Sequence, residues 1–118
     1  MSRRFHAEGD RHGVSRVVPA MHGVRPIVPD PPAEIELAAR LRAGLPDELA
    51  RLAREHAYGD ADADQGTRRV VWRAQCARFG HGVHIARGAL VKHPETFEIG
   101  DGVFVGEHAF LQGRVEGR

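Results

Sequence analysis

The sequence of 118 residues is poor in cysteine, in aromatic residues and in long apolar runs. Its single cysteine, Cys76, excludes an internal disulfide bond and favours a reducing compartment. Aromatic residues make up 6% of the chain, so a core must be built mainly from Val, Leu, Ile and Ala. No stretch approaches the roughly 18 apolar residues of a membrane span, and no apolar run follows the basic start as in a signal peptide. We therefore expect a cytoplasmic protein of one domain.

The sequence also lacks an excess of charge of either sign. It holds 17 basic and 16 acidic residues, which gives a net charge of +1. This balance gives no reason to expect nucleic acid or a membrane as a partner. Residues 1–25 carry five arginines against two acidic residues, and form either a nucleic-acid-binding arm or a solvated terminus. The arginines are dispersed around one aromatic residue, Phe5, which favours the solvated terminus.

Three segments of different character follow one another along the chain. Residues 1–32 hold five of the seven prolines and predict an irregular leader, because proline removes a backbone donor and restricts its predecessor. Residues 33–78 carry apolar residues near helical spacing and predict short helices. We expect a break between two helices at Gly44 and Pro46, and Asp30 as the cap of the first helix.

The acidic stretch 59–66 predicts a linker within this helical segment. Asp62 and Asp64 alternate as in a fragment of a calcium loop, but the glycine and the distal glutamate of such a loop are absent, which favours a solvated loop. Residues 67–78 then predict a third short helix with Thr67 as its cap.

A period of six residues begins at residue 79. Large apolar residues recur at every sixth position, with one slip of two residues, and these are Phe79, Ile85, Val91, Ile99, Val105 and Leu111. Glycines occur where tight corners need permissive backbone angles, at positions 82, 88, 100, 102 and 106. This period is typical of a repeat fold.

Two consecutive sextets carry a more specific resemblance. They read Ile-Gly-Asp-Gly-Val-Phe over 99–104 and Val-Gly-Glu-His-Ala-Phe over 105–110, and residues 111–116 fit a third. Residues 79–118 resemble the N-terminal portion of a repeat domain in the hexapeptide-repeat acyltransferases. This group of left-handed parallel β-helix proteins contains the maltose, galactoside and serine acetyltransferases.

The resemblance implies a mainly β solenoid. We expect 79–118 to start a left-handed parallel β-helix of about two coils, preceded by short α-helices and an irregular N-terminus. An insertion at 93–98 is expected to bulge out at a corner. Since three sextets make one coil, the expected neighbours in successive coils are Phe79 and Ile99, Ile85 and Val105, and Val91 and Leu111.

The resemblance also implies a function. The family transfers an acyl group, usually acetyl from acetyl-CoA, to a hydroxyl or amine, with a histidine as general base. We therefore expect an acyltransferase that uses acetyl-CoA as co-substrate and a small, sugar-like acceptor, and that forms a homotrimer. Because the family's active sites lie beside later coils, the chain is expected to be an incomplete and inactive fragment. The alternative is a non-catalytic module that trimerises or binds a partner.

The catalytic residue stays unassigned, and His93 is the best candidate. It is followed by Pro94 and Glu95, and a carboxylate beside a histidine can orient the ring. The alternative is an exposed corner residue. Three more histidines occupy outward or corner positions, where surface roles are expected: His81, His84 and His108.

No metal site is predicted. Zinc carbonic anhydrases of the same solenoid fold use three converging histidines, but His84 and His108 occupy different phases of the repeat. Phe104 and Phe110 end their sextets and should face outward, at a subunit interface or acceptor pocket, or should pack against the N-terminal helices. Cys76 has no histidine beside it in sequence, so it is not expected to be a nucleophile.

Overall fold

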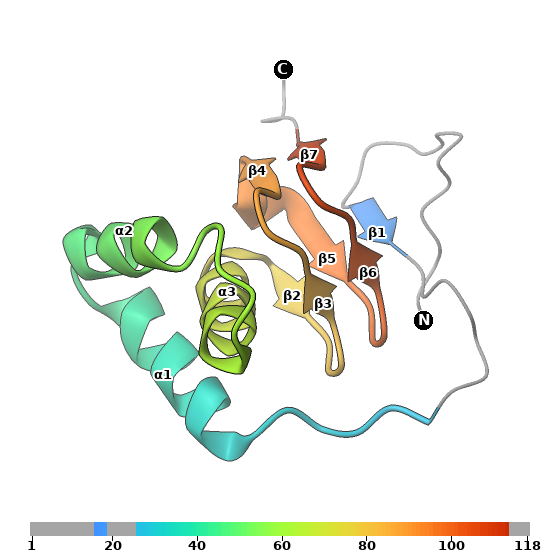
Figure 1. The fold of residues 1–118 in the computed structure, drawn as a ribbon, viewed down its shortest axis with the longest axis horizontal. Helices are drawn as coiled ribbons and strands as arrows, with labels where there is room; N and C mark the ends of the chain where they lie inside the picture. The colour runs from blue at the N-terminus through green and yellow to red at the C-terminus, as the bar shows by residue number, and fades with distance from the viewer. Residues whose placement is uncertain (1–15, 19–25, 114–118) are drawn as a thin grey trace.

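The structure, a computed structural model, describes residues 16–18 and 26–113. Helices lie on one side of the molecule and strands on the other (Figure 1). The helices are α1 (Pro32–Ala43), α2 (Pro46–Glu55) and α3 (Asp62–Gln75), and a 3-10 turn, η1, spans Pro94–Thr96. The strands are β1 (Arg16–Val18), β2 (Arg78–Phe79), β3 (His84–Ile85), β4 (Leu90–Lys92), β5 (Phe97–Ile99), β6 (Phe104–Val105) and β7 (Phe110–Gln112).

The predicted break between the first two helices is confirmed. Helix α1 ends at Ala43, next to Gly44, and Pro46 opens α2, where its missing N–H costs nothing because that donor has no partner within the helix. Asp47 and Glu48 lie in the first turn of α2, at the positive end of the helix dipole.

The starts of α1 and α3 differ from the sequence prediction. Asp30 does not cap α1, and its carboxylate instead accepts a hydrogen bond from the Gly82 N–H at 3.1 Å. Helix α3 begins inside the predicted linker 59–66, so Thr67 lies within it. The reason is Asp64, whose side chain accepts a hydrogen bond from the Ala61 N–H at 3.1 Å and thereby fixes the first turn.

Strands β2 to β7 form two successive passes of the chain, and each pass gives one strand to each of three sheets. Strand β2 pairs with β5, β3 with β6 and β4 with β7, all in parallel. In every pair the partner is the residue twenty positions later in the sequence. The expected neighbours are confirmed: Phe79 with Ile99, Ile85 with Val105, and Val91 with Leu111.

The predicted fold class is nevertheless wrong. The described chain is a mixed α/β fold, not a mainly β solenoid or left-handed β-helix. Its helices have 12, 10 and 14 residues, whereas its strands have two or three and lie in three small sheets. The physical reason is that the apolar side chains of the strands are not buried by strand stacking alone, because α3 contributes to the same core.

Helix α3 is the central layer between the other two helices and the strands. Its Val71 and Trp72 are each 5% exposed and pack into one core cluster with buried strand-side residues that include Val83, Ile85, Ile99 and Val105. On its other side, Val70 and Ala74 pack against Ala38 and Leu41 of α1. Burial on both sides explains why a helix of this length forms although its first turn is wholly polar or small.

Two features of the strands were not foreseen. The expected bulge at 93–98 is shorter, because Phe97 and Glu98 belong to β5 (Phe97–Ile99), and the Phe97 side chain is 3% exposed. Strand β1, within the predicted irregular leader, pairs in parallel with β5 on the edge opposite β2, with Val17 beside Glu98. The arginine-rich stretch of 1–15 and 19–25, and the part of the third sextet after residue 113, lie outside the described residues.

Residues with positive φ stack on one another at two corners between the strands. They are Gly82 with Gly102, and Gly88 with His108, in each case twenty positions apart. Gly88 and His108 both have positive φ angles, of 74° and 59°. A Cβ at Gly88 would lie 2.3 Å from Nδ1 of His108, so the histidine ring fills the space that the glycine leaves.

We predict that Gly88→Ala lowers the free energy of unfolding by about 1–2 kcal/mol, because an L side chain at positive φ costs about that much and the His108 ring must also move. Urea unfolding measures the change. Gly106→Ala is the matched control, since its Cβ would meet only the Phe104 ring at 3.9 Å. Equal stabilities of the two variants would contradict the corner geometry.

Candidate functional site

Three arginines of α3 hold the helix against the segments around it. Arg68 is 5% exposed and donates hydrogen bonds of 2.8 Å to the carbonyl oxygens of Ile85, His56 and Gly59. Through its Nε and Nη1 this buried guanidinium ties the strand layer and the α2–α3 turn to one side chain, while its buried Nη2 has no hydrogen-bond partner among the described residues. Its role is structural.

The other two arginines are also occupied by the protein itself. Arg69 binds both carboxylate oxygens of Glu34, at 3.0 and 2.7 Å, and this contact raises the pKa of its guanidinium. Arg73 donates to the Gly80 carbonyl at 2.7 Å and lies 5.0 Å above the Phe79 ring. Its Nη1 lies 3.0 Å from Asp30 Oδ2 without the alignment of a hydrogen bond, so this contact is one of charge. Arg69 and Arg73 are therefore both engaged by carboxylate or carbonyl oxygens of the protein.

A histidine and a carboxylate meet at the turn between α2 and α3. Nδ1 of His56 lies 2.8 Å from Oδ1 of Asp64, and the two side chains are 27% and 20% exposed. The hydrogen bond with His56 is the main reason why the pKa of Asp64 is lowered. An ionised Asp64 favours the tautomer with a proton on Nδ1, which leaves Nε2 as an acceptor. This is the geometry of an oriented base.

The His56–Asp64 pair was not predicted from the sequence. The two residues are eight positions apart and belong to different elements, and Asp64 was interpreted as part of a linker. Gly59, which lies between them in sequence, is a weak sequence signal for the pair. A Cβ at this position would lie 2.0 Å from Asp64 Oδ2, so the carboxylate needs a glycine there. The same carboxylate also fixes the start of α3, so the pair has a structural role in the turn.

His93, the catalytic candidate from the sequence, occupies a corner with positive φ, at 60°. Its carbonyl accepts hydrogen bonds from the N–H and the hydroxyl of Thr96, at 3.0 and 2.8 Å. Nδ1 of His93 lies 3.7 Å from Glu95 Oε2, and the side chains are 37% and 64% exposed. The structure thus brings the two residues near one another, at more than hydrogen-bond distance.

The remaining histidines of the strand region lie in three separate places. Nδ1 of His81 accepts a hydrogen bond from the Asp30 N–H at 3.0 Å. His84 stacks on Phe104 at 4.8 Å, and burial, together with the charges of two α3 arginines, lowers its pKa. The His108 ring lies 6.4 Å from that of Tyr58. Across the described ranges, no three His, Cys, Asp or Glu side chains gather as metal ligands would.

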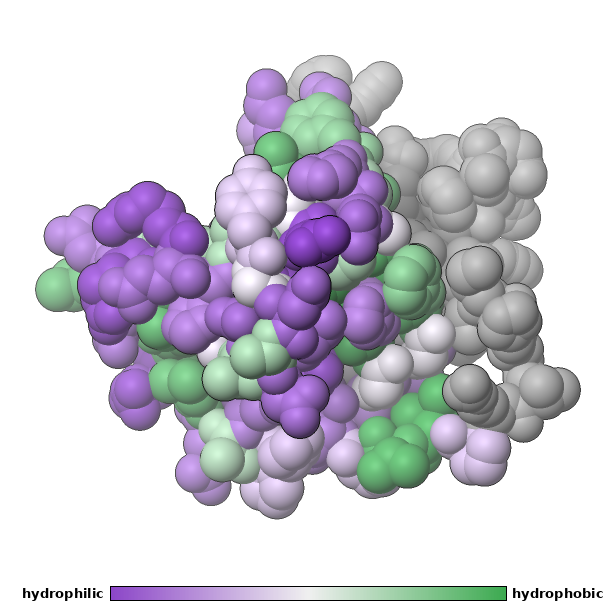
Figure 2. Space-filling model, in the orientation of Figure 1, coloured by the Kyte–Doolittle hydropathy of each residue, from purple (hydrophilic) through white to green (hydrophobic). Residues whose placement is uncertain are grey.

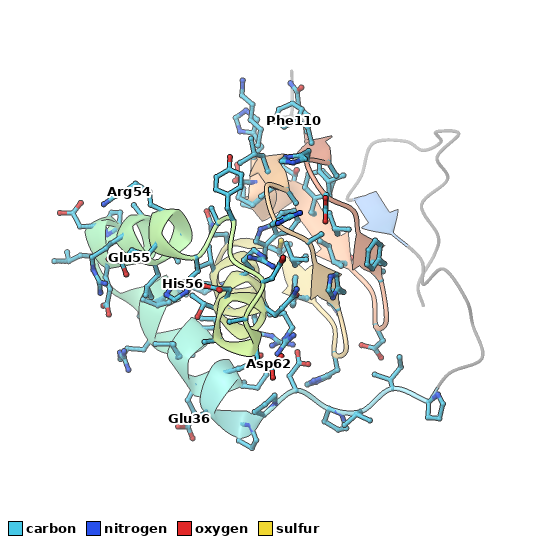
Figure 3. All side chains as sticks on the ribbon, viewed as in Figure 1. Glu36, Arg54, Glu55, His56, Asp62 and Phe110 are labelled. Atoms are coloured by element: carbon cyan, nitrogen blue, oxygen red, sulfur yellow. The ribbon has the colours of Figure 1, made fainter. Side chains whose placement is uncertain are left out.

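The two outward phenylalanines are exposed and do not pack against the helices. Phe104 and Phe110 are 50% and 56% exposed, and Figure 3 shows Phe110 at the end of the strands away from α1. On the face drawn in Figure 2, hydrophilic side chains cover α2, and hydrophobic ones reach the surface over β4 and β7, where Leu90 is 59% exposed. Cys76 is fully buried, and burial raises the pKa of its thiol to about 12, which excludes an activated nucleophile.

Comparison with known proteins gave no match: no protein-family model, no curated protein and no solved structure is significantly similar to this chain. Within the described residues, each helix is too short or too polar to cross a bilayer.

We predict that Asp64 makes stability depend on pH. The pKa of Asp64 in the folded protein is below the ordinary value of 3.8. Ionised Asp64 therefore adds to the free energy of unfolding above pH 3.8, and this addition is lost as the pH falls through the lowered pKa of the folded protein. Urea unfolding between pH 2 and 7 should therefore show wild type and Asp64→Asn converging at the acidic end.

His56→Ala serves as the second variant, since it removes the main cause of the shift. In the His56→Ala background, the free energy of unfolding should depend less on pH than it does in the wild type. Parallel pH curves for wild type and Asp64→Asn would contradict the role of the pair.

Proposed function

We propose that this protein takes part in acyl transfer, from acetyl-CoA to the hydroxyl or amine of a small, sugar-like acceptor. One observation carries the proposal. The apolar residues that resemble hexapeptide repeats pair in parallel, twenty positions apart, in all three sheets. The six-residue period thus has a structural counterpart, and the resemblance to the hexapeptide-repeat acyltransferases rests on more than composition.

In this proposal the described residues are a scaffold and do not complete a catalytic site. His93 is the candidate general base, and its 3.7 Å distance to Glu95 at an exposed corner leaves the ring only loosely oriented. The α3 arginines hold carbonyl and carboxylate groups of the protein itself. We therefore expect no turnover by the 118-residue chain.

The proposed setting is a cytoplasmic homotrimer without nucleic acid or membrane partners. The unpaired thiol of Cys76 suits a reducing compartment, and the near-neutral charge gives no attraction to polyanions. The second candidate function is a non-catalytic binding module. It is favoured by the exposure of Phe104 and Phe110, which places apolar side chains on the surface of the strand layer.

The two functions predict different responses to coenzyme. A protein that holds part of the acetyl-CoA site should show a rise of a few degrees in Tm at millimolar acetyl-CoA, because a ligand that binds the native state stabilises it. Thiol release with sugar, serine and amino-sugar acceptors should stay at the background rate.

The control ligand for the Tm measurement is a coenzyme A analogue that lacks both the thiol sulfur and the phosphate on the adenosine ribose. A protein that forms a stable trimer, shows no change in Tm and releases no thiol would contradict the acyl-transfer proposal and support the binding module. Thiol release abolished by His93→Ala would support acyl transfer and contradict the scaffold role.

A further inference from the structure

Residues 26–31, here called the strap, lead into α1 without forming a helix or strand, along the lower edge of the view in Figure 1. The strap has apolar side chains at its surface, since Ile27 and Val28 are 40% and 73% exposed. Its buried residue is charged instead, and the Asp30 side chain is only 6% exposed. A buried carboxylate must be compensated by donors from other parts of the chain.

Three donor groups from α3 and from the corner after β2 converge on the Asp30 carboxylate. Its Oδ1 accepts a hydrogen bond from the Gly82 N–H at 3.1 Å and lies 3.9 Å from Nε of Arg69. Its Oδ2 lies 3.0 Å from Nη1 of Arg73. Two guanidinium groups and a backbone N–H around one small anion are the donors with which proteins bind carboxylate and phosphate groups.

The carboxylate does not satisfy these donors fully. Nη1 of Arg73 and Oδ2 of Asp30 are both buried, and neither has a hydrogen-bond partner among the described residues although the two atoms are close. The neighbouring contact is different, because both oxygens of Glu34 accept bonds from Arg69, at 3.0 and 2.7 Å. Buried polar atoms without partners are rare in native proteins and lower stability. The planar carboxylate of Asp30 is therefore an incomplete match to the donors around it.

The charges around these donors also favour an anion. Arg69 and Arg73 face the carboxylates of Asp30 and Glu34, so two positive charges meet two negative charges. Without the Asp30 carboxylate, two guanidinium groups would face the single carboxylate of Glu34. The other acidic side chain at this corner, Asp101, accepts a hydrogen bond from the His81 N–H at 2.7 Å and is exposed to solvent, which screens its charge.

Two further contacts hold the strap at the same corner. The Asp30 N–H donates to Nδ1 of His81 at 3.0 Å. The Ile27 side chain covers the corner, because its Cγ2 would lie 3.3 Å from a Cβ at Gly82. Since the strap buries little apolar surface, its detachment exposes little to water, and local opening of such a segment has a low free-energy cost.

We propose that Arg69, Arg73 and the Gly82 N–H form a binding site for a phosphate group, and that Asp30 occupies this site as a ligand supplied by the chain itself. A phosphate group has oxygens in a tetrahedral arrangement, so it offers a separate acceptor to each donor, which the planar carboxylate does not. The strap therefore competes with phosphate and sets the affinity of the site. This proposal goes beyond acyl transfer, because phosphate binding here needs neither acetyl-CoA nor a general base.

The variant Asp30→Ala tests the proposal, since it removes the competing carboxylate and keeps the donors. Inorganic phosphate at constant ionic strength should raise the Tm of this variant saturably, because a ligand that binds the native state stabilises it. The wild type should need at least tenfold more phosphate for the same rise. The matched control is Asp101→Ala, which removes the same charge from the same corner outside the proposed site and should respond as the wild type does.

A second substitution in the Asp30→Ala background identifies the donors. Adding Arg73→Gln should weaken phosphate binding at least tenfold. Adding Arg40→Gln should leave it unchanged, because the Arg40 side chain on α1 is 66% exposed and its ion pair is with Glu48. In the Asp30→Ala variant, the amide signal of Gly82 should shift with the same phosphate midpoint as the Tm. A phosphate monoester, glycerol phosphate, that binds more tightly than inorganic phosphate would identify a phosphorylated small molecule as the ligand, and the reverse order would identify the free ion.

The wild-type protein decides the matter if Asp30→Ala does not fold even in phosphate. Its Asp30 and Gly82 amide signals should then shift together as phosphate is raised to molar concentration, and should not shift in sodium chloride of equal ionic strength. Unmoved signals in that titration overturn the proposal. Equal phosphate responses of Asp30→Ala and Asp101→Ala, or a response that survives Arg73→Gln, also overturn it.

Discussion

The parallel pairing of each strand residue with the residue twenty positions later is the constraint on which the rest of the structure depends. Successive side chains of a strand face opposite sides, so a slip of one residue would turn Ile85 and Val105 out of the core. The same offset stacks the corners, where Gly88 leaves room for the His108 ring, and it pairs Arg87 with Glu107 at 3.4 Å. Core, corners and surface contacts therefore share one register.

Helix α3 joins this strand layer to the other helices and makes the molecule a mixed α/β fold. Its apolar side chains fill one side of the strand core. Arg68 links β3 to the turn between α2 and α3 through the carbonyl oxygens of Ile85, His56 and Gly59. Removal of that guanidinium would leave buried acceptors without donors, which is among the most destabilising changes in a protein interior. The strands and helices are therefore expected to unfold together.

The sequence predicted local features and pair partners better than it predicted the fold class. Proline and glycine at 44–46 mark the helix break because their backbone limits act locally. The six-residue period identified the strand partners because periodicity records which side chains face inward. The period does not indicate how much of the core a helix supplies. The contribution of α3 to the core was therefore not predicted, and the expected solenoid was wrong.

The missed parts of the candidate site have a related cause. The His56–Asp64 pair and strand β1 are contacts between elements, and their residues carry no local signature. Asp30 resembled a helix cap, yet its backbone and carboxylate are used by His81 and Gly82, more than fifty positions later. Exposure of Phe104 and Phe110, by contrast, followed from their position in the sextet.

Cross-strand nuclear Overhauser effects test the shared register most directly. The account predicts inter-strand contacts of the parallel type that link 79 with 99, 85 with 105 and 91 with 111 in one sample. Contacts shifted by one residue in any sheet, or the close Hα–Hα contacts of antiparallel strands, would contradict it.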